Sequence, residues 1–450
     1  MMTSTKPFHL EILLDSTCSE NQCKNLREKI DEYLKENNSN VIEWLKKTIE
    51  NGHYKLSCPL DDSIQMNITV DSIANINNND DDDGKCIEDM IKNHDKDLIN
   101  YIGIYLNKLH DDTMQNCLEE DLPCTFHTFL PSKNFVNLWD SLMFESNLKI
   151  KLLNYIHAAI RLSCKSRINQ SFININKVLL LHGPPGTGKT TLCKALCQKV
   201  SIMMAEHYDN FQLIEINSHS LFSKWFSESG KLVLKLFDSI REFAEDPTNM
   251  IFVLIDEVES LAYDRQRINS ADPTDAIRVV NAILTQLDTI KQYPNIIILA
   301  TSNVSKSMDN AFVDRADIIQ YIDLPSSKMV YEILRSSIRE LIVTQVIRFD
   351  PDTEFLPWHR MNVVQNSTLN FDHNNKLKEI SLICSSNLSG RSLRKLPFLT
   401  FAMNYDYYMQ AKFIDDDDDD GKQRYVSMEK FLADLSDMIS KQILNQKHFE

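Results

Sequence analysis

The chain has 450 residues, of which 43% are apolar and 25% are charged, and its formal net charge at pH 7 is −16. This length is enough for two or three globular domains. The acidic charge argues against a protein that grips the phosphates of nucleic acid, and no apolar segment approaches the roughly 20 residues that span a bilayer, so neither a nucleic acid nor a membrane is expected as a direct partner.

The cysteines and the first residues indicate the compartment. The ten Cys form no CxxC pair and no zinc-type spacing, which is typical of free thiols. The apolar run that begins at Phe8 is short and contains Glu11, unlike the apolar core of a signal peptide. We therefore expect a protein of the nucleus or the cytoplasm. Ten of the acidic charges lie in aspartate runs at 80–83 and 415–420, which are typical of solvated loops.

Residues 1–110 are predicted to form a separate α+β domain. Strand-like patterns occur at 8–14 and 67–70, and helical spacing occurs at 21–37 and 41–49. Residues 111–133 contain Pro123 and Pro131 among acidic side chains, so we predict a linker there.

Residues 134–325 are predicted to form an α/β domain. The expected strands are at 177–182, 211–217, 251–257, 295–301 and 318–324, and the expected helices are at 148–162, 191–197, 231–243 and 273–289. Short, continuous apolar strands that alternate with helices predict a parallel sheet with helices on both faces.

Residues 326–450 are predicted to form a small helical domain. The expected helices are at 326–341, 377–384, 390–403 and 428–444. The segment 349–373 has no clear period, and we predict a loop insertion there.

A glycine-rich loop stands between the first strand and the first helix of the α/β domain. Its residues are Gly183, Pro184, Pro185, Gly186, Thr187, Gly188, Lys189 and Thr190. Strand, glycine loop and helix is the context of a phosphate-binding loop, whose backbone N–H groups and helix dipole attract phosphate oxygens. Lys189 would reach the β- and γ-phosphates of ATP, and the Thr190 hydroxyl would hold Mg²⁺. The alternative is a sharp turn that binds nothing, and the flanking strand and helix weigh against it.

Polar side chains at the ends of the next strands suggest hydrolysis. Asp256 and Glu257 close the strand at 251–257, and the carboxyl end of that strand should lie beside the phosphate loop. Asp256 would hold the Mg²⁺ shell, and Glu257 would orient and deprotonate the attacking water. Asn303, after the following strand, would position the water or sense the γ-phosphate. The alternatives are a surface acidic pair and a turn-forming asparagine.

Two arginines and one aromatic loop are further candidates. Arg315 would reach the γ-phosphate of a neighbouring subunit, or it forms an ordinary ion pair with Asp314 or Asp317. Arg391 would bring the helical domain onto the nucleotide, or it is a solvated residue at a helix start. The loop residues Lys224, Trp225 and Phe226 would grip a threaded polypeptide, or both rings lie in the core.

Together these motifs resemble the AAA+ ATPases, with the helical domain as the AAA+ lid. The segments 213–231, 275–281, 312–317 and 388–398 are similar, more narrowly, to the pachytene checkpoint protein 2 / thyroid receptor-interacting protein 13 family. The resemblance adds Thr191 to the nucleotide contacts, makes Trp225 part of a first pore loop and places a second at 263–272.

The family resemblance also implies a function. It implies a homo-oligomer, expected to be a hexamer, that uses ATP and Mg²⁺ to convert HORMA-domain proteins from a closed to an open state, directly or through an adaptor. Residues 1–110 would dock the substrate or adaptor. The expected processes are meiotic recombination and spindle checkpoints, at meiotic chromosomes and kinetochores in the nucleus and in the cytoplasm.

Three other functions are weighed against this one. A DNA-directed clamp loader would share the phosphate loop, but the acidic charge and the aromatic loop oppose it. A non-hydrolysing nucleotide switch or scaffold is opposed by the presence of Lys189, Asp256, Glu257 and Arg315. A microtubule-severing relative would want basic segments for the acidic microtubule surface, and the sequence shows none.

Overall fold

The alternating strands and helices in the middle of the chain form a six-stranded sheet in the computed structural model, in the order β10-β6-β9-β8-β7-β5. Its strands are β5 (Thr125–Leu130), β6 (Val178–His182), β7 (Asn210–Asn217), β8 (Asn249–Asp256), β9 (Ile296–Ser302) and β10 (Ile318–Tyr321). All neighbouring pairs are parallel except β5, which pairs antiparallel with β7. The predicted α/β class is confirmed.

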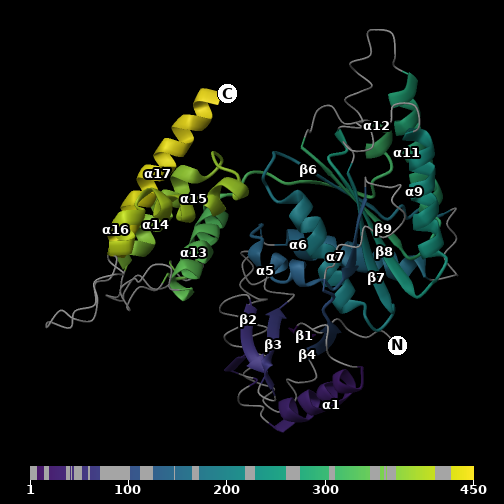
Figure 1. Ribbon diagram of the computed structural model, residues 1–450, viewed down its shortest axis with the longest axis horizontal. Helices are drawn as coiled ribbons and strands as arrows, with labels where there is room; N and C mark the ends of the chain where they lie inside the picture. The colour runs from purple at the N-terminus through teal and green to yellow at the C-terminus, as the bar shows by residue number, and fades with distance from the viewer. Residues whose placement is uncertain are drawn as a thin grey trace. The chain divides into compact units, whose positions relative to one another are not determined.

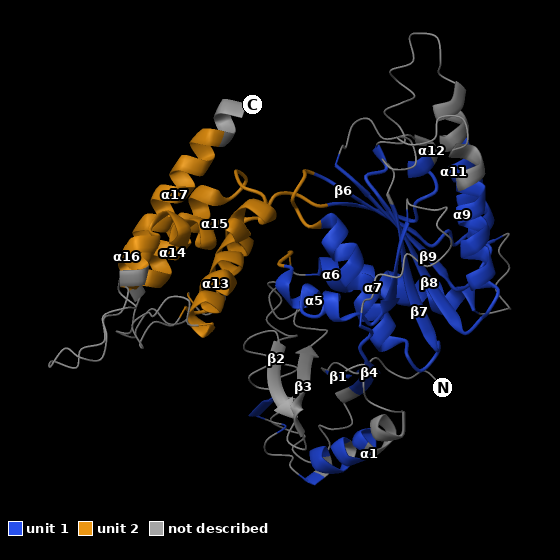
Figure 2. Cartoon of the chain, viewed as in Figure 1, with its two compact units in different colours: residues 1–142, 146–183, 189–321 blue, residues 143–145, 184–188, 322–450 orange. Residues whose placement is uncertain are grey.

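The structure describes only part of the chain, and its contacts form two compact units (Figure 2). The described residues are 8–14, 20–36, 41, 43–44, 53–58, 61–70, 102–111, 125–145, 147–164, 172–217, 229–259, 274–303, 310–344, 355–358, 361, 371–410 and 427–449. Unit 1 comprises 1–142, 146–183 and 189–321, and unit 2 comprises 143–145, 184–188 and 322–450. Both aspartate runs and both predicted pore loops lie outside the described residues.

Helices cover both faces of the six-stranded sheet (Figure 1). On one side lie α9 (Ser229–Ala244) and α11 (Thr274–Ile290), whose buried residues pack against alternate residues of β6, β7, β8 and β9. On the other side lie α6 (Leu148–Ser163) and α7 (Lys189–Met203). Because both faces are covered, β9 is buried along its whole length, as expected for a parallel strand.

The edge strand β5 corrects the predicted linker at 111–133. Residues Thr125–Leu130 belong to the sheet rather than to a connection. Its two phenylalanines, Phe126 and Phe129, are each 44% exposed. The sequence of β5, TFHTFL, lacks the continuous apolar run that identifies a central strand. Only the pairing of β5 with β7 shows that this segment is a strand.

The first part of unit 1 is a smaller sheet with the order β2-β3-β1-β4. It contains β1 (Phe8–Leu14), β2 (His53–Cys58), β3 (Asp61–Val70) and β4 (Ile102–Lys108), and it is accompanied by α1 (Glu20–Glu36). The strand predicted at 8–14 and the helix predicted at 21–37 are confirmed. The sequence interpretation missed β2 and β4 and found only the last residues of β3.

Unit 2 is a helical bundle. Its helices are α13 (Ser327–Val343), α14 (Phe371–Cys384), α15 (Gly390–Met403), α16 (Tyr405–Gln410) and α17 (Met428–Phe449). Tyr331 and Phe431 lie fully buried in its core, and Phe355 and Met361 belong to the same core at 7% and 6% exposure. Part of the predicted loop insertion at 349–373 therefore packs inside the bundle. No helix in the described ranges has the length and apolar content to cross a membrane.

Candidate active site

The glycine-rich loop has a backbone that only glycine adopts easily. Gly186 and Gly188 have φ angles of 77° and 91°, where other residues are strained. A Cβ atom on Gly186 would stand 2.6 Å from the Ser389 hydroxyl oxygen. Within the loop, the Thr187 hydroxyl donates to the Pro184 carbonyl at 3.0 Å. The loop thus keeps a tight turn, as a phosphate cradle requires.

Lys189 begins α7 directly after the loop. Its side chain is 5% exposed, and its Nζ donates to the Gly183 carbonyl at 2.9 Å. The Gly183 N–H in turn donates to the Ser302 carbonyl at the end of β9, at 3.2 Å. The start of a helix presents N–H groups and a positive dipole end, and here it also carries an ammonium group. This set of donors fits the phosphates of a nucleotide.

Two hydroxyl groups converge on the carboxylate of Asp256 at the end of β8. The Thr190 hydroxyl donates to Asp256 Oδ1 at 2.8 Å, and the Thr301 hydroxyl also donates to Oδ1. Hydroxyl and carboxylate oxygens are the ligands that Mg²⁺ prefers. Thr190 and Asp256 therefore suit the metal that accompanies ATP. Within the described residues, no group of three or more His, Cys, Asp or Glu side chains forms a further metal site.

Glu257 lies beside Asn303, which follows the neighbouring strand β9. The Asn303 Nδ2 donates to Glu257 Oε1 at 3.2 Å. Glu257 has a φ of 56°, a left-handed conformation that costs a non-glycine residue roughly 1–3 kcal/mol and is enriched at active sites. The chain therefore turns sharply after Asp256.

Two residues that the sequence interpretation missed support this turn. The Glu257 N–H donates to the Thr301 hydroxyl at 3.2 Å, and the Asn303 N–H donates to Glu259 Oε1 at 3.0 Å. Thr301 is 1% exposed and stands two residues before Asn303. In the sequence, only the positions of Thr301 and Glu259 could have identified them, because both residues lie close to predicted site residues at the carboxyl ends of β9 and β8.

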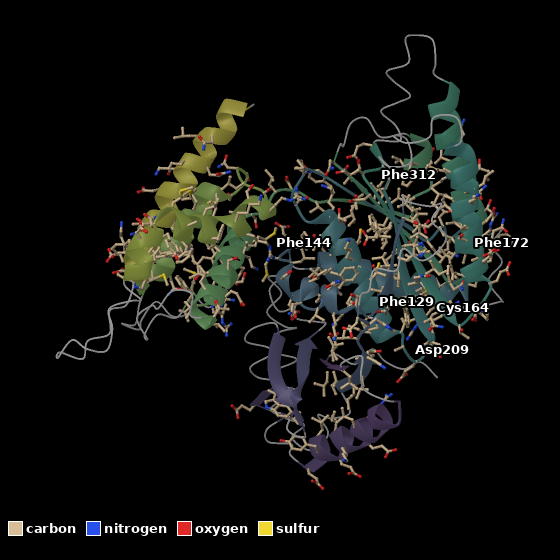
Figure 3. All side chains as sticks on the ribbon, in the orientation of Figure 1. Phe129, Phe144, Cys164, Phe172, Asp209 and Phe312 are labelled. Carbon is tan, nitrogen blue, oxygen red and sulfur yellow. The ribbon has the colours of Figure 1, made fainter. Side chains whose placement is uncertain are left out.

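Arg315 follows the short helix α12 (Asn310–Val313). Its Nε and an Nη atom donate to the two carboxylate oxygens of Asp288 on α11, at 3.0 and 2.7 Å. This bidentate pair lowers the pKa of the Asp288 carboxyl, chiefly through the hydrogen bond from Arg315 and also through Lys291. Phe312, which Figure 3 labels, is buried and accepts the Arg315 N–H on its carbonyl at 3.2 Å.

Asp288, which forms an ion pair with Arg315, is neither of the two partners considered from the sequence, Asp314 and Asp317. Asp317 accepts hydrogen bonds from the Tyr155 hydroxyl at 2.8 Å and from the Lys177 N–H at 2.7 Å. Burial of the Tyr155 hydroxyl and its hydrogen bond to Asp317 raise the pKa of Tyr155. Asp317 thus joins α6 to the entry of β6, while Asp288 orients Arg315.

Arg391 lies in the first turn of α15, where Ser389 caps the helix by accepting the Ser392 N–H at 3.3 Å. The Arg391 N–H donates to the Gly186 carbonyl at 3.1 Å, and its side chain is exposed. Within unit 2, Arg391 therefore contacts the glycine-rich loop through its backbone N–H. Thr191 lies in the first turn of α7, half-buried.

A histidine at the end of β6 is another residue that the sequence interpretation missed. The His182 ring lies 5.2 Å from the Tyr321 ring, measured between centroids. Burial and the nearby Lys189 lower the pKa of His182, which disfavours a second positive charge beside the loop. The predicted pore-loop residues Lys224, Trp225 and Phe226 lie outside the described residues.

Known proteins share this architecture. Residues 179–324 match the family model of the ATPase family associated with various cellular activities (AAA), and residues 326–443 match the TRIP13-like, AAA+ ATPase lid C-terminal domain. The Pachytene checkpoint protein 2 homolog of Xenopus tropicalis is 47% identical over 337 residues, covering 73% of this chain and 72% of the relative. The human homolog is 43% identical over 357 residues, 77% of each chain.

A solved structure agrees with these matches. The structure of C. elegans PCH-2 aligns with a TM-score of 0.68 at 30% sequence identity, and it covers 97% of this chain and 99% of that one.

Proposed function

The chain belongs to the pachytene checkpoint protein 2 family of AAA ATPases, and we propose that it uses ATP hydrolysis to convert HORMA-domain proteins from a closed to an open state and to disassemble their complexes. Family membership supports the ATPase activity directly. The observation that carries the chemistry is the convergence of Thr190, Asp256, Glu257 and Asn303 at one edge of the sheet.

ATP is bound, in this proposal, through its phosphates. The backbone N–H groups of residues 183–190 and the start of α7 face the phosphate oxygens, and Lys189 exchanges its bond to the Gly183 carbonyl for the β- and γ-phosphates. Thr190 and Asp256 would hold Mg²⁺, which supplies charge neutralisation during phosphoryl transfer. Thr191 adds a nucleotide contact in the same turn.

Water activation is assigned to Glu257. A carboxylate at this place accepts a proton from the attacking water and orients the oxygen for in-line attack on the γ-phosphate. Asn303 holds Glu257 Oε1 through its amide and would sense the γ-phosphate with the same group. Both roles need the Glu257 side chain to keep one direction, which the fixed turn after Asp256 supports.

Assembly is proposed to complete the site. Arg315 would contribute its guanidinium to the nucleotide of the neighbouring subunit in a homohexamer, so that hydrolysis depends on assembly. Arg391 would couple the lid to nucleotide state through the Gly186 carbonyl. Trp225 and its neighbours Lys224 and Phe226 would grip the substrate segment, while residues 1–110 would dock the HORMA protein or an adaptor.

The proposed places of action are meiotic chromosomes and kinetochores in the nucleus, and the cytoplasm. The proposed processes are the meiotic recombination checkpoint and the spindle assembly checkpoint, and membership of a family named for the pachytene checkpoint supports a checkpoint role.

The role of Glu257 is tested by Glu257→Gln. The amide keeps the shape of the side chain but cannot accept a proton, so we expect kcat to fall by about 10²–10⁴-fold. ATP binding should persist, because the phosphate contacts come from other residues, and the variant should trap ATP and substrate together. Glu242→Gln on the exposed side of α9 is the control. Hydrolysis near the wild-type rate in Glu257→Gln would contradict the assignment of water activation to Glu257.

The remodelling proposal is tested by measuring steady-state hydrolysis with and without a purified HORMA-domain protein. We expect the HORMA protein to stimulate hydrolysis in the wild type and to have no effect on Trp225→Ala, because a pore residue acts only on engaged substrate. An equal rate of hydrolysis with and without the HORMA protein, also in the presence of an adaptor protein, would contradict the proposed substrate. It would leave the proposed ATPase activity standing.

A further inference from the structure

Thr301, to which the sequence analysis assigned no role, forms hydrogen bonds with three residues at the end of β8. Its hydroxyl donates to Asp256 Oδ1 and accepts the Glu257 N–H at 3.2 Å. Its backbone carbonyl accepts the Val258 N–H at 2.9 Å. One residue of β9 therefore binds three consecutive residues at the end of β8, including both carboxylate residues of the site.

We propose that Thr301 is a positioning residue that holds Asp256 and Glu257 in register for ATP hydrolysis. This inference rests on the proposed function, because it takes Glu257 as the group that activates water. The side chain of Thr301 acts through the two carboxylate residues and has no assigned contact with the nucleotide.

The chemistry of a hydroxyl explains why threonine suits this position. A hydroxyl carries a single proton to donate and lone pairs to accept. The backbone N–H of Glu257 can only donate, so the Thr301 hydroxyl accepts from it and donates its own proton to Asp256. The bond to Asp256 needs an acceptor, which the carboxylate provides. The bond to Glu257 needs the N–H to point toward Thr301, which the sharp turn provides.

The turn at Glu257 is what needs holding. Glu257 has a φ of 56°, outside the conformations that non-glycine residues favour. In the left-handed conformation its N–H leaves the strand ladder, and Thr301 supplies the acceptor. The next N–H, from Val258, also bonds to Thr301. Without these bonds the chain after Asp256 could relax toward an ordinary strand, which would turn the Glu257 side chain away from Asn303.

Burial makes the contact specific. Thr301 is 1% exposed and Ser302 is fully buried, so water cannot easily replace a missing hydroxyl. Register also contributes, since Ile255 of β8 pairs with Ala300 of β9. The sheet thus sets Thr301 opposite the end of β8 before any nucleotide arrives.

Glu259 supports the same arrangement from the other side. Its Oε1 accepts the Asn303 N–H at 3.0 Å, and its Oε2 is buried without a hydrogen-bond partner among the described residues. Asn303, in turn, holds Glu257 Oε1. Glu257 is therefore held twice, through its backbone N–H by Thr301 and through its side chain by Asn303.

The test compares Thr301→Val with Thr301→Ser in the full-length assembled protein. Valine keeps the β-branched shape but removes the donor and the acceptor, and serine keeps both. We expect Thr301→Val to lower kcat by about 100-fold, the typical cost of a misplaced catalytic group, with the affinity for ADP unchanged. Thr301→Ser should restore most of the rate.

The matched control is Thr400→Val in unit 2. Thr400 is also fully buried, and its hydroxyl donates to the Leu396 carbonyl of its own helix at 2.9 Å. This variant should keep the wild-type kcat. A thermal unfolding midpoint is recorded for every variant, so that a fall in rate is compared at equal folded fraction.

Several outcomes would overturn the role of Thr301. They are a wild-type kcat in Thr301→Val, a loss of ADP affinity that matches the loss of rate, or a serine variant as slow as the valine variant. Measuring Glu257→Gln in parallel separates the two proposals. If Glu257→Gln stops hydrolysis while Thr301→Val hydrolyses normally, only the role of Thr301 fails. No hydrolysis by the wild-type assembly would overturn both.

Discussion

Arg315 shows how a single residue combines a proposed catalytic role with a structural contact. Its guanidinium forms two hydrogen bonds to Asp288, at 3.0 and 2.7 Å. Lys291 also contacts Asp288, at 2.8 Å. A planar guanidinium held at two points keeps one direction, so Asp288 would aim Arg315 within its own subunit before a neighbour arrives.

This ion pair predicts a pH dependence of stability. The pKa of Asp288 is lowered in the folded protein, so the pair contributes stability above the unfolded pKa of about 3.9, and this contribution is lost as the pH falls through the folded value. We expect the wild type to lose more of its thermal unfolding midpoint between about pH 5 and pH 3 than Asp288→Asn does. Asp314→Asn, one residue before Arg315, is the control and should follow the wild type. Parallel curves for Asp288→Asn and the wild type would contradict the prediction.

At the scale of elements, the central strands of the six-stranded sheet and its edge strand β10 could be predicted from the sequence, whereas the other edge strand, β5, could not. Continuous apolar runs identify β6, β8 and β9 because both faces of a central parallel strand are buried. The strand β5 has exposed phenylalanines and lies at an edge. The segment Thr125–Leu130 therefore shows neither a full apolar run nor a clean alternation, and the residues of β7 that pair with it stand 81 to 91 positions later in the chain.

The same reasoning applies to the site. Asp256, Glu257 and Asn303 could be predicted because each follows an apolar run, and parallel strands bring their carboxyl ends to one edge. Thr301 and Asp288 could not, because their roles depend on tertiary contacts. Thr301 acts through the pairing of β8 with β9, and Asp288 stands 27 residues before Arg315. No local pattern records either contact.

For the molecule as a whole, α7 links the nucleotide site to the N-terminal sheet within unit 1. The helix begins at Lys189 of the glycine-rich loop, and near its other end Lys199 forms a buried ion pair with Glu11 of β1. The Asn107 side-chain amide of β4 donates to the Ile202 carbonyl at 3.2 Å. Gln198 and the backbone of Ser132 exchange two hydrogen bonds, at 2.9 and 3.1 Å. The domain proposed to dock substrate is thus bound to the helix that begins at the nucleotide.

The buried pair gives the last prediction. Lys199→Met keeps the apolar stem but leaves the Glu11 carboxylate buried without its cation, and removing one partner of a buried pair costs about 3–5 kcal/mol. We expect faster amide hydrogen exchange in β1 and α1, measured by mass spectrometry. Adding Glu11→Gln to Lys199→Met should slow the exchange again, because the unpaired charge is gone. The matched control is Arg27→Met, which breaks the exposed pair between Arg27 of α1 and Glu206, three residues after the end of α7, where side-chain exposure is 50% and 66%. An exposed pair contributes only about 0–1 kcal/mol, so this control should exchange like the wild type. Equal exchange in Lys199→Met and Arg27→Met would show that the buried pair does not hold the N-terminal sheet on α7.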